Sequence, residues 1–205
     1  MGAIPSIKGS VFASVVEDVR KLIERGGVSR DEAARRLTPA DLRLLETEIY
    51  VSHWYDIRAY ARLSELLRDT EGEGDSEFLR QKGRETAKRL LEAGHYAQLE
   101  YLQRAGVSKA KDTAARFEAF GRDLRLLTTL SGSILNFSRW MPLPDPVQKG
   151  RYLIQVSDAK DMPEALCWRS DGFVNEMATQ HGDKDLWTWE RQRADLVVFR
   201  MTRSL

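Results

Sequence analysis

The chain has 205 residues, of which 32 are basic, 31 acidic and 42% hydrophobic. A net charge of +1 gives no overall electrostatic field that would attract nucleic acid. No apolar run approaches the roughly 20 residues of a membrane helix, and one cysteine cannot form an internal disulfide. We therefore expect a single cytoplasmic domain over residues 1–205, with no membrane span and no nucleic-acid partner.

Apolar side chains recur every three or four positions from about residue 10 to residue 131, which predicts a run of helices. The first stretch, SVFASVVEDVRKLIERGG, carries one broad apolar stripe and ends at Gly26 and Gly27. Capping patterns then mark two short helices, one at Ser29 and one at Thr38-Pro39. Further helices are expected at residues 56–68, 76–94, 95–106 and 109–131, with the loop DTEGEGD after the first of these.

The pattern changes after Gly132, where short alternating stretches predict strands. The expected strands cover residues 133–141, 151–157, 186–192 and 195–203. A helix from Asp161 and Pro163 to Gly182 separates the two pairs, so the order is β-β-α-β-β with antiparallel pairing. The fold class is α+β: a helical part, residues 10–131, packed on a small antiparallel sheet with one helix, residues 132–205.

This order, with the stretches RLTPADLRLLE, HWYDIRAYARLSELLRD and FLRQKGRETAKRLLEAGHY, resembles a superfamily of three branches. Its branches are haem nitric-oxide-binding domains, 4-vinyl-reductase domains and vesicle-tethering TRAPP subunits. Within it, the chain resembles a paralogous family of myxobacterial proteins of unknown function. Asn136-Phe137, placed at the opening of the first strand, and Gly172-Phe173 in the late helix fit this resemblance, which covers about residues 11–203.

The sequence departs from the superfamily's cofactor motifs. Haem-binding members carry a histidine on the long helix and a Tyr-x-Ser-x-Arg motif, whereas this chain has Ser131 near the first position and NFSRW near the second. Haem iron needs an axial ligand, so the resemblance implies no haem here, and we expect no cofactor. Vinyl-reductase domains often bring clustered cysteines, and Cys167 stands alone. A TRAPP-like scaffold, in some members with a lipid-filled groove, requires no special chemistry.

Candidate catalytic and metal-binding residues are few. Cys167 is a nucleophile only if His53 or His181 lies beside it, and otherwise it is a small buried hydrophobe. His53, His95 and His181 have no paired spacing, so we expect no metal site and name no catalytic residue.

The stretch HWYDIRAYAR is the richest candidate for a ligand site, because aromatic rings suit an apolar body and arginines suit an anionic head. The alternative is that Trp54 and Tyr60 anchor a helix on the sheet. A second recognition element is expected in SRWMPLPDP. The predicted ligand-binding residues are His53, Trp54, Tyr55, Arg58, Tyr60, Arg139 and Trp140.

The sequence therefore predicts a non-enzymatic regulatory, sensory or scaffold module that binds a small apolar or anionic, lipid-like ligand or a protein partner. The alternative is an enzyme that uses Cys167 or a histidine–acid pair assembled in three dimensions. The broad stripe of the first helix predicts a homodimer, with Phe12, Val16 and Tyr60 as contacts.

Overall fold

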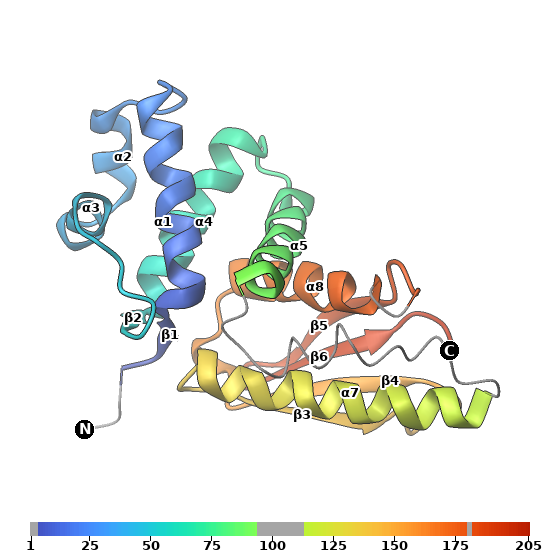
Figure 1. Ribbon diagram of the computed structural model, residues 1–205. Coiled ribbons are helices and arrows are strands. Elements are labelled where there is room, and N and C mark those ends of the chain that lie inside the picture. The colour runs from blue at the N-terminus through green and yellow to red at the C-terminus, as the bar shows by residue number, and fades with distance from the viewer. Residues whose placement is uncertain (1–3, 94–112, 180–181) are drawn as a thin grey trace.

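The computed structural model describes residues 4–93, 113–179 and 182–205, and it has the α+β architecture that the sequence predicts (Figure 1). The first part of the chain is mainly helical. Its elements are β1 (Ser6–Lys8), α1 (Gly9–Glu24), α2 (Arg30–Arg36), α3 (Pro39–Glu46), β2 (Trp54–Asp56), α4 (Ile57–Glu71), α5 (Ser76–Ala93) and α7 (Thr113–Ile134). The helix expected at residues 95–106 lies outside the described residues.

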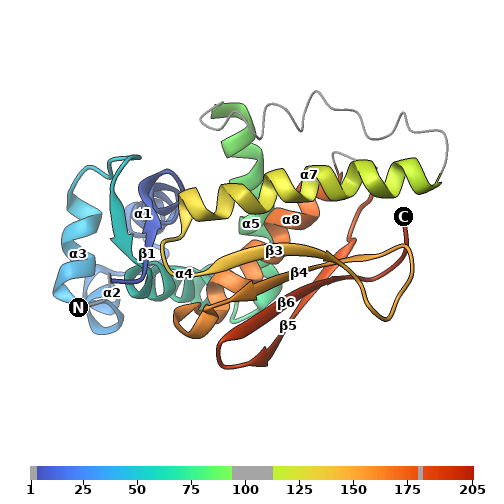
Figure 2. The same cartoon turned by 90° about the horizontal axis from the view of Figure 1, so that it is seen from below.

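The second part forms the predicted β-β-α-β-β unit. Its elements are β3 (Arg139–Pro144), β4 (Tyr152–Ser157), the 3-10 helix η2 (Ala159–Asp161), α8 (Glu164–Thr179), β5 (Trp187–Arg193) and β6 (Leu196–Met201). The strands pair antiparallel in the order β3-β4-β6-β5, and Figure 2 shows α7 running alongside β3.

Local capping chemistry explains where the short helices begin. The Thr38 side chain accepts a hydrogen bond from the Asp41 backbone nitrogen, and the Asp41 carboxylate accepts one from the Thr38 backbone nitrogen, 2.9 Å away. Pro39 follows at the first helical position. Ser29 caps α2 with its side chain alone, by accepting from the Glu32 nitrogen at 3.1 Å. Both predicted starts are confirmed because a cap needs only neighbouring residues.

The sequence reading missed a small second sheet. β1 pairs antiparallel with β2, with Ser6 opposite Asp56 and Lys8 opposite Trp54. Each strand has three residues, which is too short to produce an alternating pattern.

The start of the first large strand was also predicted too early. α7 continues to Ile134 and β3 begins only at Arg139, so Asn136-Phe137 precedes the strand rather than opening it. The Asn136 Oδ1 instead accepts from the Ser6 nitrogen at 2.7 Å and its Nδ2 donates to the Ile4 oxygen at 3.0 Å. Asn136 therefore ties the N-terminal segment to the sheet half.

The core lies between the helices and the inner face of the sheet. Tyr152 of β4 stacks on Phe117 of α7 with a 4.2 Å centroid distance, and Trp187 of β5 lies 6.3 Å from Phe120. α8 packs between α5 and the sheet, and α1 to α4 gather beyond one end of the strands (Figure 1). None of the described helices is long and apolar enough to cross a membrane.

The predicted dimer contacts were wrong. Phe12 and Val16 have no exposed surface and Tyr60 is 1% exposed, because α3, α4 and α5 all pack on α1 and cover its broad stripe. These side chains belong to the core of the protomer, and the homodimer itself stays a prediction.

Candidate functional site

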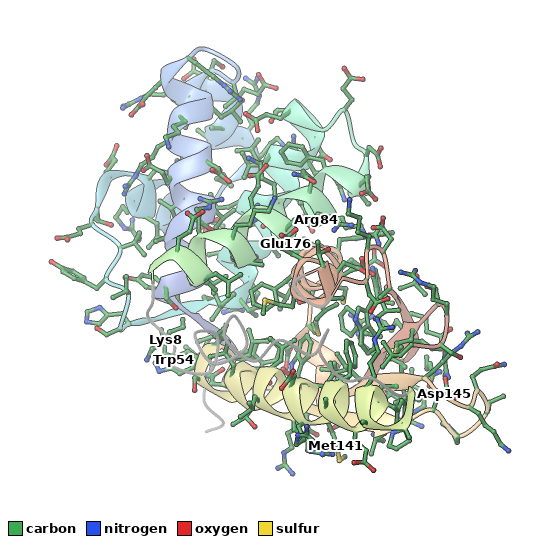
Figure 3. The ribbon with its side chains drawn as sticks, turned by 45° about the vertical axis from the view of Figure 1, so that its right-hand side comes forward. Lys8, Trp54, Arg84, Met141, Asp145 and Glu176 are labelled. Carbon is green, nitrogen blue, oxygen red and sulfur yellow. The ribbon has the colours of Figure 1, made fainter. Side chains whose placement is uncertain are left out.

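A cavity of about 90 Å³ lies where the helical part meets the sheet. Its lining is mainly aliphatic and aromatic, and it comes from eight elements: β1, α1, α4, α5, α7, α8, β3 and β4. Figure 3 looks along α8 and shows it between α5 and α7, the helices that enclose the cavity with it. Its polar and aromatic lining residues include Tyr60, Thr86, Thr128, Ser131, Trp140 and Arg169.

Two glycines bring α5 and α8 into backbone contact beside this cavity. A Cβ atom on Gly83 of α5 would lie 1.9 Å from the Arg169 carbonyl oxygen, and one on Gly172 of α8 would lie 1.8 Å from the Arg80 carbonyl oxygen. Each helix therefore needs a residue without a side chain at the crossing. The contact fixes the position of α8 and of Arg169 on it.

Arg169 is the only charged side chain among the described residues of the lining, and it is 2% exposed. None of its three guanidinium nitrogens makes a hydrogen bond with a described residue, and it has no ion pair there. The guanidinium carbon lies 5.6 Å from the centre of the Tyr60 ring, which gives a cation–π contact. The aromatic face offsets part of the charge, but a ring face is a weak substitute for hydrogen-bond acceptors at the N–H groups.

Nearby carboxylates are engaged by other residues. Asp171 pairs with Arg80 of α5 and accepts from the Asn175 Nδ2 at 2.9 Å. Burial raises the pKa of Asp171, while Arg80 acts in the opposite direction. Asp18 of α1 lies 3.5 Å from Lys82 and 3.9 Å from Arg89. No described carboxylate forms a hydrogen bond or an ion pair with Arg169.

The Tyr60 hydroxyl is protonated at neutral pH. Burial raises the pKa of this phenol, and the positive charge of Arg169 lowers it only in part. Tyr60 and Arg169 thus present one neutral and one cationic group to the same cavity.

Two of the seven predicted ligand-binding residues, Tyr60 and Trp140, line this cavity. Their sequence separation is large, and the packing of α4 and β3 around α7 and α8 brings them together. The alternative, that Trp54 and Tyr60 anchor a helix on the sheet, is not supported by these contacts: the Tyr60 ring lies 6.5 Å from that of Phe12 on helix α1, and Trp54 is exposed.

The other five predicted residues lie outside the described lining of the cavity. The exposed Trp54 ring is covered by the Lys8 ammonium at 4.4 Å, and the Tyr55 ring stacks on Phe12 at 4.6 Å. The remaining three are exposed: His53 beside Tyr50, Arg58 paired with Asp56, and Arg139 paired with Asp158. A ligand-binding role for these five stays a prediction.

Sequence reasoning missed Arg169. The sequence of α8 has no clear polar face, and buried residues surround the helix. One signal was present: charged residues within a helix that is buried all round require internal partners or a ligand.

Cys167 does not have the surroundings of a nucleophile. Its side chain has no exposed surface, and burial raises the pKa of the thiol to about 12, although Arg191 acts in the opposite direction. The Arg191 Nη2 lies 3.7 Å from the sulfur. The only described histidine, His53, is exposed beside Tyr50, and His95 and His181 lie outside the described residues. A protonated, buried thiol is inert.

The described ranges contain no group of three His, Cys, Asp or Glu side chains that is arranged to hold a metal ion.

No protein-family model and no curated protein matches the chain. Solved structures do match it. An H-NOX protein from S. oneidensis in the Fe(II)NO ligation state is 13% identical, with a TM-score of 0.54, over 95% of this chain and 98% of that one. A structure solved to probe haem distortion in the H-NOX family is 13% identical, with a TM-score of 0.53, over 97% of both chains.

A third structure, solved to study how porphyrin distortion by the protein modulates haem redox potential, is 14% identical with a TM-score of 0.52. It is matched over 95% of this chain and 99% of that one. The chain therefore shares the fold of these H-NOX structures, which agrees with the resemblance of its sequence. Identities of 13–14% establish the fold alone.

The described cavity does not fit haem. Its described lining contains no histidine, cysteine or methionine to ligate iron. The buried Tyr60 is the one lining residue of a type that ligates haem iron, and Arg169 lies over its ring. A volume of about 90 Å³ is well below the roughly 300–1,000 Å³ of pockets for larger ligands.

Proposed function

We propose that this chain is a non-enzymatic sensory or regulatory module whose ligand occupies the cavity between α7 and α8. The observation that carries this proposal is the combination of an apolar cavity of about 90 Å³ with one buried charge that no described residue neutralises. Ligand pockets are mostly apolar and contain a few placed polar groups. The fold shared with H-NOX proteins supports a sensory role.

The position of the cavity suits signalling, because its lining comes from both parts of the chain. A ligand there contacts α5 and α7 from the helical part, and β3, β4 and α8 from the sheet part. Binding therefore changes the relative stability of arrangements of these elements, which a protein partner is able to detect. A non-enzymatic role is supported by the inert environment of Cys167.

A cavity-filling substitution tests the proposal. Ser131 of α7 lines the cavity, whereas Thr129 of the same helix is exposed and lies outside its described lining. We expect native mass spectrometry of protein from its own cells to show a bound small molecule in the wild type and in Thr129→Leu. Ser131→Leu should lack it, since the added side chain fills the space. Equal ligand content in wild type and Ser131→Leu would contradict the proposal.

Four further statements remain proposals: that the protein is a homodimer, that it is a single domain, that it is cytoplasmic, and that it belongs to the myxobacterial family. Light scattering at micromolar concentration addresses the first: a constant mass of 23.5 kDa, the mass of one chain, would reject the dimer.

A further inference from the structure

We infer that the ligand of this cavity is a short aliphatic monocarboxylate, with its carboxylate held by Arg169 and its chain in the apolar lining. This inference rests on the proposed function and adds the chemical class of the ligand. Its first basis is that Arg169 is 2% exposed and makes no hydrogen bond or ion pair with a described residue.

An arginine cannot become neutral by losing its proton, so its charge persists in the cavity. A buried, uncompensated charge is strongly unfavourable. Of the neighbouring carboxylates, Asp171 is hydrogen-bonded to Arg80. Asp18 forms ion pairs with Lys82 and Arg89, although its buried Oδ2 makes no hydrogen bond, and neither carboxylate forms an ion pair with Arg169. An anion from outside the described chain is therefore the group that completes the site.

The charge of the site selects a monoanion. Arg169 is the single charged residue in the described lining, so a phosphate dianion would leave one negative charge uncompensated among apolar side chains. The planar guanidinium fork matches the two oxygens of a carboxylate in a bidentate pair. A monocarboxylate balances both the charge and the geometry.

The volume and the other lining groups select a short apolar body. An engineered apolar cavity of about 150 Å³ admits benzene, so about 90 Å³ accommodates a smaller chain. The lining threonines use their hydroxyl protons within their own helices: Thr86 donates to the Lys82 oxygen at 2.8 Å and Thr128 to the Leu124 oxygen at 2.9 Å. These residues place no demand for polar groups on the ligand chain.

The test compares butyrate with butyramide, a neutral molecule of the same shape, and with inorganic phosphate. Binding is measured by calorimetry and by the shift of the unfolding midpoint Tm. We expect butyrate to bind the wild type and raise its Tm, and butyramide and phosphate to have no effect. Ser131→Leu should lose the butyrate response, and Thr129→Leu should keep it.

Variants of Arg169 separate a ligand-binding role from a structural one. Arg169→Met should abolish the butyrate response and raise the Tm of the ligand-free protein, because an uncompensated buried charge is removed. Arg169→Lys keeps the charge without the fork, and it should weaken butyrate binding by about tenfold. Arg193→Met, which removes an exposed arginine of β5, should leave both readouts unchanged.

Several results would overturn the inference. Equal binding of butyramide and butyrate would show that the ligand needs no anionic group, and it would leave the proposed function unaffected. Phosphate binding that depends on Arg169 would show that the ligand class is wrong. A lower Tm of ligand-free Arg169→Met would show that Arg169 has partners in the fold. If butyrate fails to bind and Ser131→Leu carries the same ligand content as the wild type, the proposed function fails as well.

Discussion

Replacing Gly83 by alanine tests the backbone contact that positions α8. The new Cβ would lie 1.9 Å from the Arg169 carbonyl oxygen, whereas ordinary contact begins at 3.4 Å, so the shortfall is 1.5 Å. Alanine gains about 1 kcal/mol of helix propensity over glycine. Overpacking of this kind costs about 1–3 kcal/mol and occasionally more, and here the obstacle is backbone that cannot change rotamer. With a cost at the upper end of this range, about 3 kcal/mol, less the gain in propensity, we expect a net loss of about 2 kcal/mol in the free energy of unfolding.

Urea denaturation followed by circular dichroism measures this loss, and Gly132→Ala is the matched control. Gly132 is exposed on α7, and nothing lies within 4 Å of an added Cβ, so that variant should gain up to about 1 kcal/mol. Gly83→Ala combined with Gly172→Ala should lose less than the sum of the single losses, because one separation of α5 and α8 relieves both overlaps. Unchanged or increased stability of Gly83→Ala would refute the close contact.

Three further predictions concern other parts of the chain. Although burial raises the pKa of Asp41, hydrogen bonds from Arg62 (2.6 Å) and Thr38 hold it below its ordinary value of 3.8. Because the unfolded chain takes up the proton first, this stabilisation is complete above about pH 4 and is lost as pH falls through the lower folded pKa. In acid denaturation, the free energy of unfolding should therefore fall less steeply with decreasing pH for Asp41→Asn than for the wild type. Cys167, with its pKa raised to about 12, should react with a thiol reagent at pH 8.5 only in denaturant, and fast reaction of the folded protein would contradict its burial. Protein expressed with a haem supply should show no Soret absorption, and a Soret band would refute our interpretation of the cavity.

Local features in the sequence were enough to predict most of the elements. The start of α3 follows from Thr38 and Asp41, which satisfy each other's backbone within one turn. Tyr152, Ile154 and Val156 of β4 are all buried, as expected for a sheet with one face against helices. Leu153 is buried as well, in a separate cluster with Leu196 and Val198. The order β-β-α-β-β then limits the pairing to short antiparallel connections.

Long-range pairing was beyond local reasoning. β1 and β2 have three residues each and are separated by three helices, so no period or turn signal links them. The predicted dimer contacts failed for a related reason. A broad apolar stripe on α1 indicates that much surface is buried, and only the arrangement of α3, α4 and α5 decides that the same chain covers it.

The candidate site shows the same difference between what local sequence predicts and what the tertiary structure decides. The sequence identified Tyr60 and Trp140 by their chemistry, and the tertiary structure decided that they share a cavity with Arg169. Sequence proximity suggests that Arg169 pairs with Asp171, but residues two apart on a helix point to different sides. Asp171 reaches Arg80 of α5, and Arg169 faces the cavity with no hydrogen bond or ion pair to a described residue. Whether a buried charge is compensated depends on its neighbours in space, and the packing of helices brought together from distant parts of the chain determines those neighbours.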